Sequence, residues 1–277
     1  MRIIADTATL FSPEEGAALG LEMVPVGVAI DGQSYKDYIE ITPEQFLERI
    51  AAGGSPSSSQ PALGDLLEKM EAAGEEEVIV LTVGDGLSGG YQTALGARNC
   101  LEKPDRVHVV NSGSLAGPLR HMARKAVQMR ADGCSVQQIL AALEECVRSS
   151  VSFVVPADFE FLRRSGRLTA ITAKIGGVLK LLPVLTQTED RTRITPCAIR
   201  RSWGGALEVM LQRLEEKKPD RNWKIFVCHG GVPEQGDRMA CQVREKFPEC
   251  ETEVLQLSPA LMTHGGPGCI VLQAVKL

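Results

Sequence analysis

The chain has 277 residues, a formal net charge of -5 and 44% hydrophobic residues. This length suits one large α/β domain or two modest ones, and the apolar content excludes a disordered chain. The acidic balance lacks the basic footprint typical of nucleic-acid-binding proteins, so we expect no nucleic-acid partner.

The eight cysteines fit neither a zinc template nor a Cys-x-x-Cys pattern. We therefore expect no metal site and reduced, mostly buried thiols. No apolar run approaches the roughly 20 residues needed to cross a bilayer, so we expect no stable membrane insertion. The N-terminus enters a strand pattern at once instead of a signal peptide, which favours a cytoplasmic location.

Strand and helix patterns alternate along the chain. Short apolar runs predict strands at residues 2–5, 23–30, 78–83, 107–110, 151–155, 224–228 and 253–257. Runs of this length that end in small polar residues are typical of parallel strands, which are buried on both faces. Helical patterns cover residues 43–52, 63–73, 90–100, 115–131, 136–148 and 204–217. This alternation predicts α/β layers with right-handed crossovers.

The amino-acid composition of the chain changes after residue 150. Residues 156–168 are basic with a helical pattern, and residues 169–185 are almost wholly apolar or small. We therefore expect an α/β domain at residues 1–150 and a second α/β domain at residues 151–277. The Gly- and Ser-rich residues 53–59 predict a surface loop or a site loop.

Polar groups follow the predicted strands that end at residues 5, 83, 110 and 228. Open α/β sheets bind ligands at the carboxyl ends of their strands, so strands that share a sheet would gather these groups at one edge. Ser88 and Gly89 are the most suggestive, because a hydroxyl and free N–H groups just before a helix suit an anion. A Ser N-cap in a tight Gly turn explains the same pattern.

Two further polar clusters and one apolar segment are candidates. His264 lies among glycines and could donate to an anion or act as an acid or base, although an ordinary loop histidine remains an alternative. Arg167 follows a glycine and could turn toward a carboxylate, or lie on a solvated helix face. Residues 173–185 could line an apolar tunnel, or simply fill the core.

Taken in order, these motifs resemble the DegV family of fatty-acid-binding proteins over essentially the whole chain. The matching segments are Asp6-Thr7, residues 24–26 (Val-Pro-Val), 35–37 (Tyr-Lys-Asp), 59–61 (Ser-Gln-Pro), 87–92 (Leu-Ser-Gly-Gly-Tyr-Gln), 162–167 (Leu-Arg-Arg-Ser-Gly-Arg) and 264–268 (His-Gly-Gly-Pro-Gly). The resemblance implies a larger, mainly parallel-sheet α/β domain and a smaller α/β domain, with the ligand between and inside them.

The resemblance also implies a ligand and a set of site residues. The carboxylate of a long-chain fatty acid would be bound by Ser88, Gly89, His264, Arg167 and Ser59. Ser59 enters this set because Ala62 stands where the family usually has a hydroxyl. The acyl chain would be lined by Ile175, Val178, Leu179, Leu182 and Leu185.

The implied function is that of a carrier with no cofactor beyond its bound fatty acid. Such proteins present the fatty acid to a separate fatty acid kinase, and Arg163, Arg164, Arg200 and Arg201 are candidates for the partner surface. We expect no catalytic residues, since the sequence shows no oriented nucleophile and base, no metal site and no phosphate cradle. The alternative is a hydrolase or transferase that acts on a small acyl substrate, with Ser88 as nucleophile and His264 as base.

Overall fold

The computed structural model describes residues 1–169 and 181–277. Its strands are β1 (Arg2–Asp6), β2 (Glu22–Val24), β3 (Gly27–Ile30), β4 (Gln33–Lys36), β5 (Pro56–Ser59), β6 (Val78–Thr82), β7 (Val107–Asn111), β8 (Val151–Val155), β9 (Leu182–Gln187), β10 (Ile194–Arg200), β11 (Trp223–His229), β12 (Glu251–Gln256) and β13 (Ile270–Lys276). Its α-helices are α1 (Pro13–Leu19), α2 (Pro43–Ala51), α3 (Leu63–Ala72), α4 (Gly90–Asn99), α5 (Ala116–Ala131), α6 (Val136–Ser149), α7 (Phe159–Ser165), α8 (Trp203–Glu215), α9 (Pro233–Lys246) and α10 (Pro259–Gly265).

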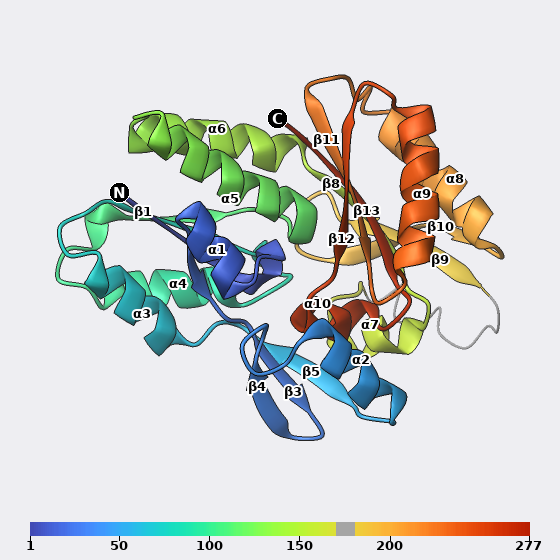
Figure 1. Cartoon of the computed structure of the whole chain (residues 1–277), viewed down its shortest axis with the longest axis horizontal. Coiled ribbons are helices and arrows are strands. Elements are labelled where there is room, and N and C mark those ends of the chain that lie inside the picture. Colours follow the sequence, from blue (N-terminus) through green and yellow to red (C-terminus); the bar gives the residue numbers. More distant parts are fainter. Residues whose placement is uncertain (170–180) are drawn as a thin grey trace.

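Within these described residues the strands form three sheets (Figure 1). The parallel sheet has the strand order β2-β1-β6-β7, and all its strand pairs are parallel. The mixed sheet has the order β10-β9-β8-β13-β11-β12, and the small sheet has the order β4-β3-β5. The predicted α/β fold with a parallel sheet is therefore confirmed.

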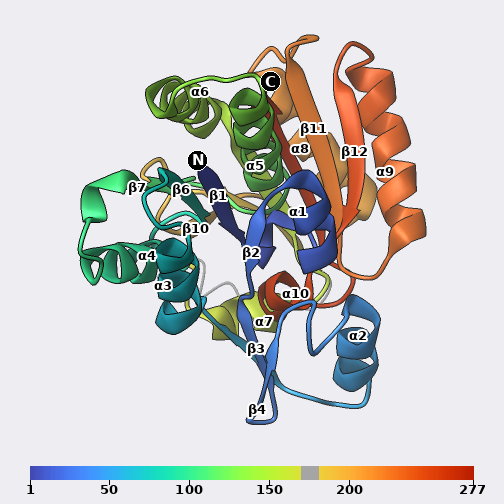
Figure 2. The same cartoon turned by 60° about the vertical axis from the view of Figure 1, so that its left-hand side comes forward.

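Helix α5 joins the two larger sheets. It contacts β1 and β6 of the parallel sheet and β11 and β13 of the mixed sheet (Figures 1 and 2). One hydrophobic cluster accordingly includes Leu81 from the parallel sheet, Leu119 from α5 and Phe226 from the mixed sheet. A side chain at Gly117 of α5 would lie 2.3 Å from Cγ of Phe226, so the helix can approach the mixed sheet this closely only with a glycine there.

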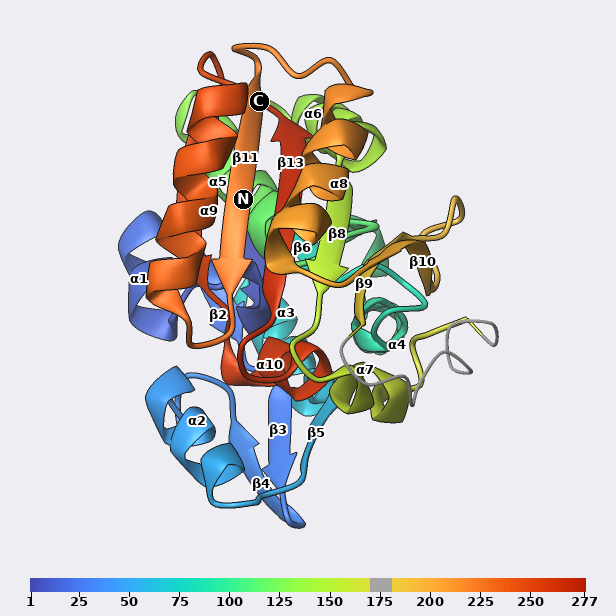
Figure 3. The same cartoon turned by 90° about the vertical axis from the view of Figure 1, so that its right-hand side faces the viewer.

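Helices α8 and α9 cover the other face of the mixed sheet, and α10 lies at the end of that sheet against the small sheet and α7 (Figure 3). The 3₁₀ segment Thr7–Thr9 continues directly from β1. Loops that follow β1, β6 and β7 lie at the carboxyl edge of the parallel sheet, as predicted. The segment that follows β11 lies at the end of a strand of the mixed sheet instead, where Gly230 packs against Gly266 and Cys269.

Three sequence predictions about the elements are wrong. Residues 23–30 form two strands in different sheets, since Pro25 has no N–H to continue a ladder. Residues 56–59 of the predicted loop form β5, an edge strand, which is where a strand tolerates Pro56. The segments at 151–155 and 224–228 are strands, and β11 pairs parallel with β12 as predicted. Both β8 and β11 also pair antiparallel with β13, which has no counterpart among the strands predicted from the sequence.

Candidate functional site

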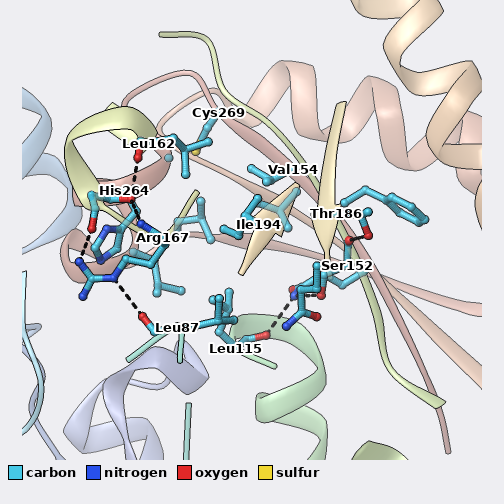
Figure 4. Close-up of a pocket in the computed structure, with 18 residues that line it drawn as sticks. Leu87, Leu115, Ser152, Val154, Leu162, Arg167, Thr186, Ile194, His264 and Cys269 are labelled. Carbon is cyan, nitrogen blue, oxygen red and sulfur yellow. Dashed lines mark hydrogen bonds between the residues drawn. The ribbon is translucent and has the colours of Figure 1, made fainter. Parts of the chain in front are cut away.

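A partly enclosed cavity of about 100 Å³ lies where α7, α10 and the mixed sheet meet the loop before α4 (Figure 4). Its apolar lining comes from segments far apart in the chain: Leu87, Leu115, Phe153, Val154, Leu162, Ile194, Leu257, Leu261, Cys269 and Val271. His264 and Arg167 lie at one side of it, and Ser152 and Thr186 lie at the other. The cavity is therefore an apolar space with a basic end and a hydroxyl-bearing end.

His264 marks the basic end. Its Nε2 is joined to Oγ of Ser58 by a hydrogen bond of 2.8 Å. Its Nδ1 is buried and has no hydrogen-bond partner among the residues that the structure describes. Burial, with a smaller contribution from the positive charge of Arg167, lowers the pKa of His264 to about 4. The imidazole is therefore neutral near pH 7, and one of its nitrogens is available to a ligand.

Arg167 lies beside His264 and is held by backbone carbonyls. Its Nε donates to the carbonyl of Leu87 at 3.1 Å, and its Nη1 donates to the carbonyl of Ser165. Burial and the neighbouring Arg193 lower its pKa from the ordinary value. Within residues 1–169 and 181–277, no carboxylate forms an ion pair with Arg167. The guanidinium is thus oriented and available to an anion.

Ser88 and Gly89 lie on the other side of Arg167. Both line a shallow depression together with Arg167 and Arg193, and neither lines the cavity. Oγ of Ser88 accepts a hydrogen bond from the N–H of Gly90 at 3.2 Å. The N-cap of α4 is Gly89, so Ser88 is not the N-cap that the alternative interpretation expects. Arg167 and Leu87 border both spaces.

Strand alternation decides which serine of β5 reaches the site. Ser59, the predicted residue, is exposed, whereas Ser58 is partly buried and bonds to His264. Successive side chains of a strand point to opposite faces, so the two serines cannot both face His264. Residues 53–59 have the composition of a loop, so the sequence alone reveals neither this alternation nor Ser58.

The predicted acyl-chain lining is only partly described. Ile175, Val178 and Leu179 lie outside the described residues. Leu182 and Leu185 belong to β9 and do not line this cavity, whereas their neighbours Thr186 and Gln187 do. Leu185 packs in a cluster with Leu162 and Ile194, one layer behind the cavity wall.

The hydroxyl-bearing end of the cavity is closed by polar groups that bond to one another. Gln273 is fully buried, and its Nε2 donates to Oγ of Ser152 at 2.8 Å and to the carbonyl of Leu115 at 3.1 Å. Oγ1 of Thr186 donates to the carbonyl of Ser152 at 2.9 Å. Because these groups are satisfied internally, they can border an apolar ligand without leaving unpaired polar atoms.

A buried acidic network lies under α10, the helix that carries His264. Asp37 accepts hydrogen bonds from Oγ1 of Thr7 at 2.7 Å and from the N–H of Ala260 in α10 at 3.2 Å. Asp6 accepts a bond from the N–H of Ala8 at 2.9 Å. Burial raises the pKa of both carboxyl groups to about 7. The Asp-Thr and Tyr-x-Asp motifs of the sequence therefore connect the parallel sheet to α10.

The four arginines predicted to form a partner surface are exposed. Arg163 forms an ion pair with Glu160 at 2.7 Å, and the guanidinium of Arg164 lies 5.1 Å from the centre of the Phe161 ring. Arg200 ends β10, and Arg201 follows it. Arg163 and Arg164 belong to α7, whose Leu162 and Ser165 line the cavity.

The contacts do not form the nucleophile–base pair that the enzymatic alternative requires. Ser88 bonds to Gly90 while His264 bonds to Ser58, so the described contacts do not join Ser88 to His264. A catalytic base also needs an orienting partner at its second nitrogen, and Nδ1 of His264 has none among the described residues. Burial raises the pKa of the Cys269 thiol to about 12, which keeps this cavity thiol protonated.

Neither a metal cluster nor a membrane helix is present in the part of the chain that the structure describes. No group of three or more His, Cys, Asp or Glu side chains there could hold a metal ion. Its helices also fall short of the length and apolarity that crossing a bilayer demands.

The fold and the cavity define an α/β protein with an apolar pocket that ends in a neutral imidazole and a guanidinium. The chain belongs to the DegV family, since residues 1–277 match the family described as "Uncharacterised protein, DegV family". The resemblance seen in the sequence motifs is therefore confirmed. A DegV domain-containing protein of Listeria innocua is 28% identical over 282 residues, which cover 98% of this chain and 96% of the relative.

Solved structures share the fold. One described as "Fatty Acid Binding of a DegV family Protein from Thermus thermophilus" is 28% identical, with a TM-score of 0.90 and full coverage of both chains. A stearic-acid-binding protein from Eubacterium ventriosum is 21% identical, with a TM-score of 0.88 over 100% of this chain and 98% of that chain. At that identity, the second likeness shows the fold alone.

Proposed function

We propose that this protein binds a long-chain fatty acid, with the acyl chain in the cavity and the carboxylate at His264 and Arg167. The observation that carries the proposal is the pairing of a buried Nδ1, unpartnered among the described residues, with a guanidinium that has no described carboxylate partner. Both lie at one end of an apolar cavity. The fatty acid binding described for the Thermus thermophilus relative supports the same ligand class.

The two ends of a fatty acid make different demands. Each buried methylene contributes about 0.8 kcal/mol, which requires apolar walls such as Val154 and Ile194. A carboxylate cannot be buried without compensation, which requires donors such as Arg167. Ser88 and Gly89 border Arg167 on its outer side, and we assign them to the entrance. Ser59 faces away from His264, so Ser58 replaces it in this proposal.

The cavity must expand to receive a whole acyl chain. Pockets that enclose drug-sized ligands measure about 300–1,000 Å³, whereas this cavity measures about 100 Å³. We retain the sequence prediction that Ile175, Val178 and Leu179 line the acyl chain. Leu185 would form a second layer behind Leu162 and Ile194, whereas Leu182 packs with the cluster that includes Val184 and is not part of this lining. The acyl chain would extend from His264 toward Ser152 and Thr186.

Organic extraction of the purified protein followed by mass spectrometry tests the proposed function. We expect a co-purifying long-chain fatty acid, or stoichiometric uptake of added palmitic acid by delipidated protein. A delipidated protein that takes up neither palmitic nor oleic acid at micromolar concentration would contradict the proposal.

We also propose that the protein is a non-catalytic carrier that presents its fatty acid to a fatty acid kinase in the cytoplasm. We further propose that residues 1–150 and residues 151–277 form two separate α/β domains. The support for this division is that the parallel sheet takes its strands from residues up to Asn111 and the mixed sheet from Val151 onward. Arg163 and Arg164 would dock the kinase beside the cavity, because their helix also lines it.

Reversing the charge of both residues, by Arg163→Glu with Arg164→Glu, is expected to slow fatty-acid phosphorylation about 10-fold at limiting carrier concentration. The dissociation constant for the fatty acid should change less than about twofold, since rim charges act on partner encounter. Arg221→Glu, at another exposed arginine, is the control. The pair Arg200→Glu with Arg201→Glu tests the second basic segment. An unchanged rate, or a parallel loss of fatty-acid affinity, would count against this docking surface.

A further inference from the structure

We propose that Ser58 is a positioning residue, which holds His264 in the tautomer that offers an Nδ1–H donor to the ligand carboxylate. The inference rests on the proposed function and deepens it, because it assigns the direction of a hydrogen bond at the same site. Ser58 lies on β5 and His264 on α10, and Oγ and Nε2 are 2.8 Å apart.

Neutral imidazole has one donor nitrogen and one acceptor nitrogen. If the hydroxyl of Ser58 donates to Nε2, the proton of the ring must be on Nδ1. The opposite tautomer would present the lone pair of Nδ1 to the carboxylate, and this arrangement is repulsive. The bond from Ser58 therefore selects the tautomer that an anionic ligand can use, in the way that the partner of one ring nitrogen commonly sets the state of the other.

The residues around His264 support a neutral ring with its proton on Nδ1. Nδ1 is buried and unpartnered among the described residues, so no other described group holds the ring proton there. Arg167, whose positive charge disfavours imidazolium, supplies the charge, and His264 supplies a neutral donor. A neutral donor beside a guanidinium adds a directed hydrogen bond without a second buried positive charge.

The alternation of side chains along β5 prevents Ser57 and Ser59 from taking the place of Ser58 in the hydrogen bond to His264. In β5, Ser57 and Ser59 are exposed and Ser58 is partly buried. Ser58 pairs with Val28 of β3, and α10 contacts both strands. A hydroxyl one residue away would point to the other face of the sheet.

The test compares Ser58→Ala, Ser58→Thr and the matched control Ser59→Ala. Palmitic acid affinity is measured by displacement of a fluorescent fatty acid, and the His264 tautomer by ¹⁵N chemical shifts of histidine-labelled protein with palmitic acid bound. We expect Ser58→Ala to weaken binding about 3- to 10-fold and to reduce the Nδ1–H tautomer. Ser58→Thr should restore both, and Ser59→Ala should match the unmodified protein.

Two results would overturn the inference while leaving the proposed function intact. The first is equal palmitic acid affinity in Ser58→Ala and the unmodified protein. The second is weaker binding in Ser58→Ala with His264 still wholly in the Nδ1–H form, which would indicate a merely structural role. A failure of the unmodified protein to bind any fatty acid would instead overturn the proposed function, and this inference with it.

Discussion

Replacing Arg167 with methionine is expected to weaken fatty-acid binding about 10- to 100-fold, because a hydrogen bond to a charged group contributes about 1.5–3 kcal/mol. The guanidinium is oriented by the carbonyls of Leu87 and Ser165, so it is prepared for the carboxylate before the ligand arrives. Pre-organisation of this kind lowers the entropic cost of binding. Isothermal titration with palmitic acid measures the change.

Arg163→Met is the matched control, since Arg163 is exposed and forms an ion pair with Glu160. It should change the affinity less than about twofold. Arg167→Lys should give an intermediate loss, because an ammonium keeps the charge without the planar fork. Unchanged affinity in Arg167→Met would show that the carboxylate is bound elsewhere.

Replacing Asp37 with alanine is expected to lower the free energy of unfolding by about 2–4 kcal/mol. Asp37 is fully buried, and the change would leave the hydroxyl of Thr7 and the N–H of Ala260 without their acceptor. Chemical denaturation measures the loss. Asp105→Ala, at an exposed position, should stay within about 0.5 kcal/mol. A loss below about 1 kcal/mol in Asp37→Ala would contradict the role of this network.

The contribution of the Asp37 carboxyl group to the free energy of unfolding should depend on pH. Burial raises the pKa of Asp37 from 3.8 to about 7 in the folded protein, so the folded state binds its proton more tightly than the unfolded state does. The stability that this group contributes is therefore full below about pH 4 and is lost as pH rises through 7. As pH falls from 8 to 5, the free energy of unfolding of the unmodified protein should increase relative to that of Asp37→Asn. A difference independent of pH would contradict the buried, proton-binding carboxyl.

The local pattern of the sequence predicts the centre of the parallel sheet well, because β1 and β6 are short apolar runs that are almost wholly buried. In the mixed sheet it predicts β8, β11 and β12 but misses β9, β10 and β13, and β13 lies at the centre of that sheet. Gln273 lies in the middle of β13 and interrupts its apolar run, yet it is fully buried because Ser152 and Leu115 satisfy it. Such a partner is set by tertiary structure and cannot be read from the neighbouring residues.

The sequence predicts the type of site, an anion-binding group beside an apolar space, but only some of the residues that form it. The motifs predict His264 and Arg167, because a His among glycines and an Arg that follows a glycine can approach an anion closely. They miss Ser58 by one residue, because the alternation of β5 could not be recognised in a segment interpreted as a loop. They also miss Leu87, Leu115 and Ile194, since periodicity shows which face of an element is buried but not which buried face borders a cavity.

A crystal structure of the protein with 16-bromohexadecanoic acid tests the central claim most directly. Density for the carboxylate should lie within hydrogen-bond reach of Nδ1 of His264 and of the Arg167 guanidinium. The anomalous signal of bromine should lie beyond Val154 and Ile194, toward Ser152 and Thr186. Bromine at the His264 end, or a ligand wholly outside the cavity, would contradict the account.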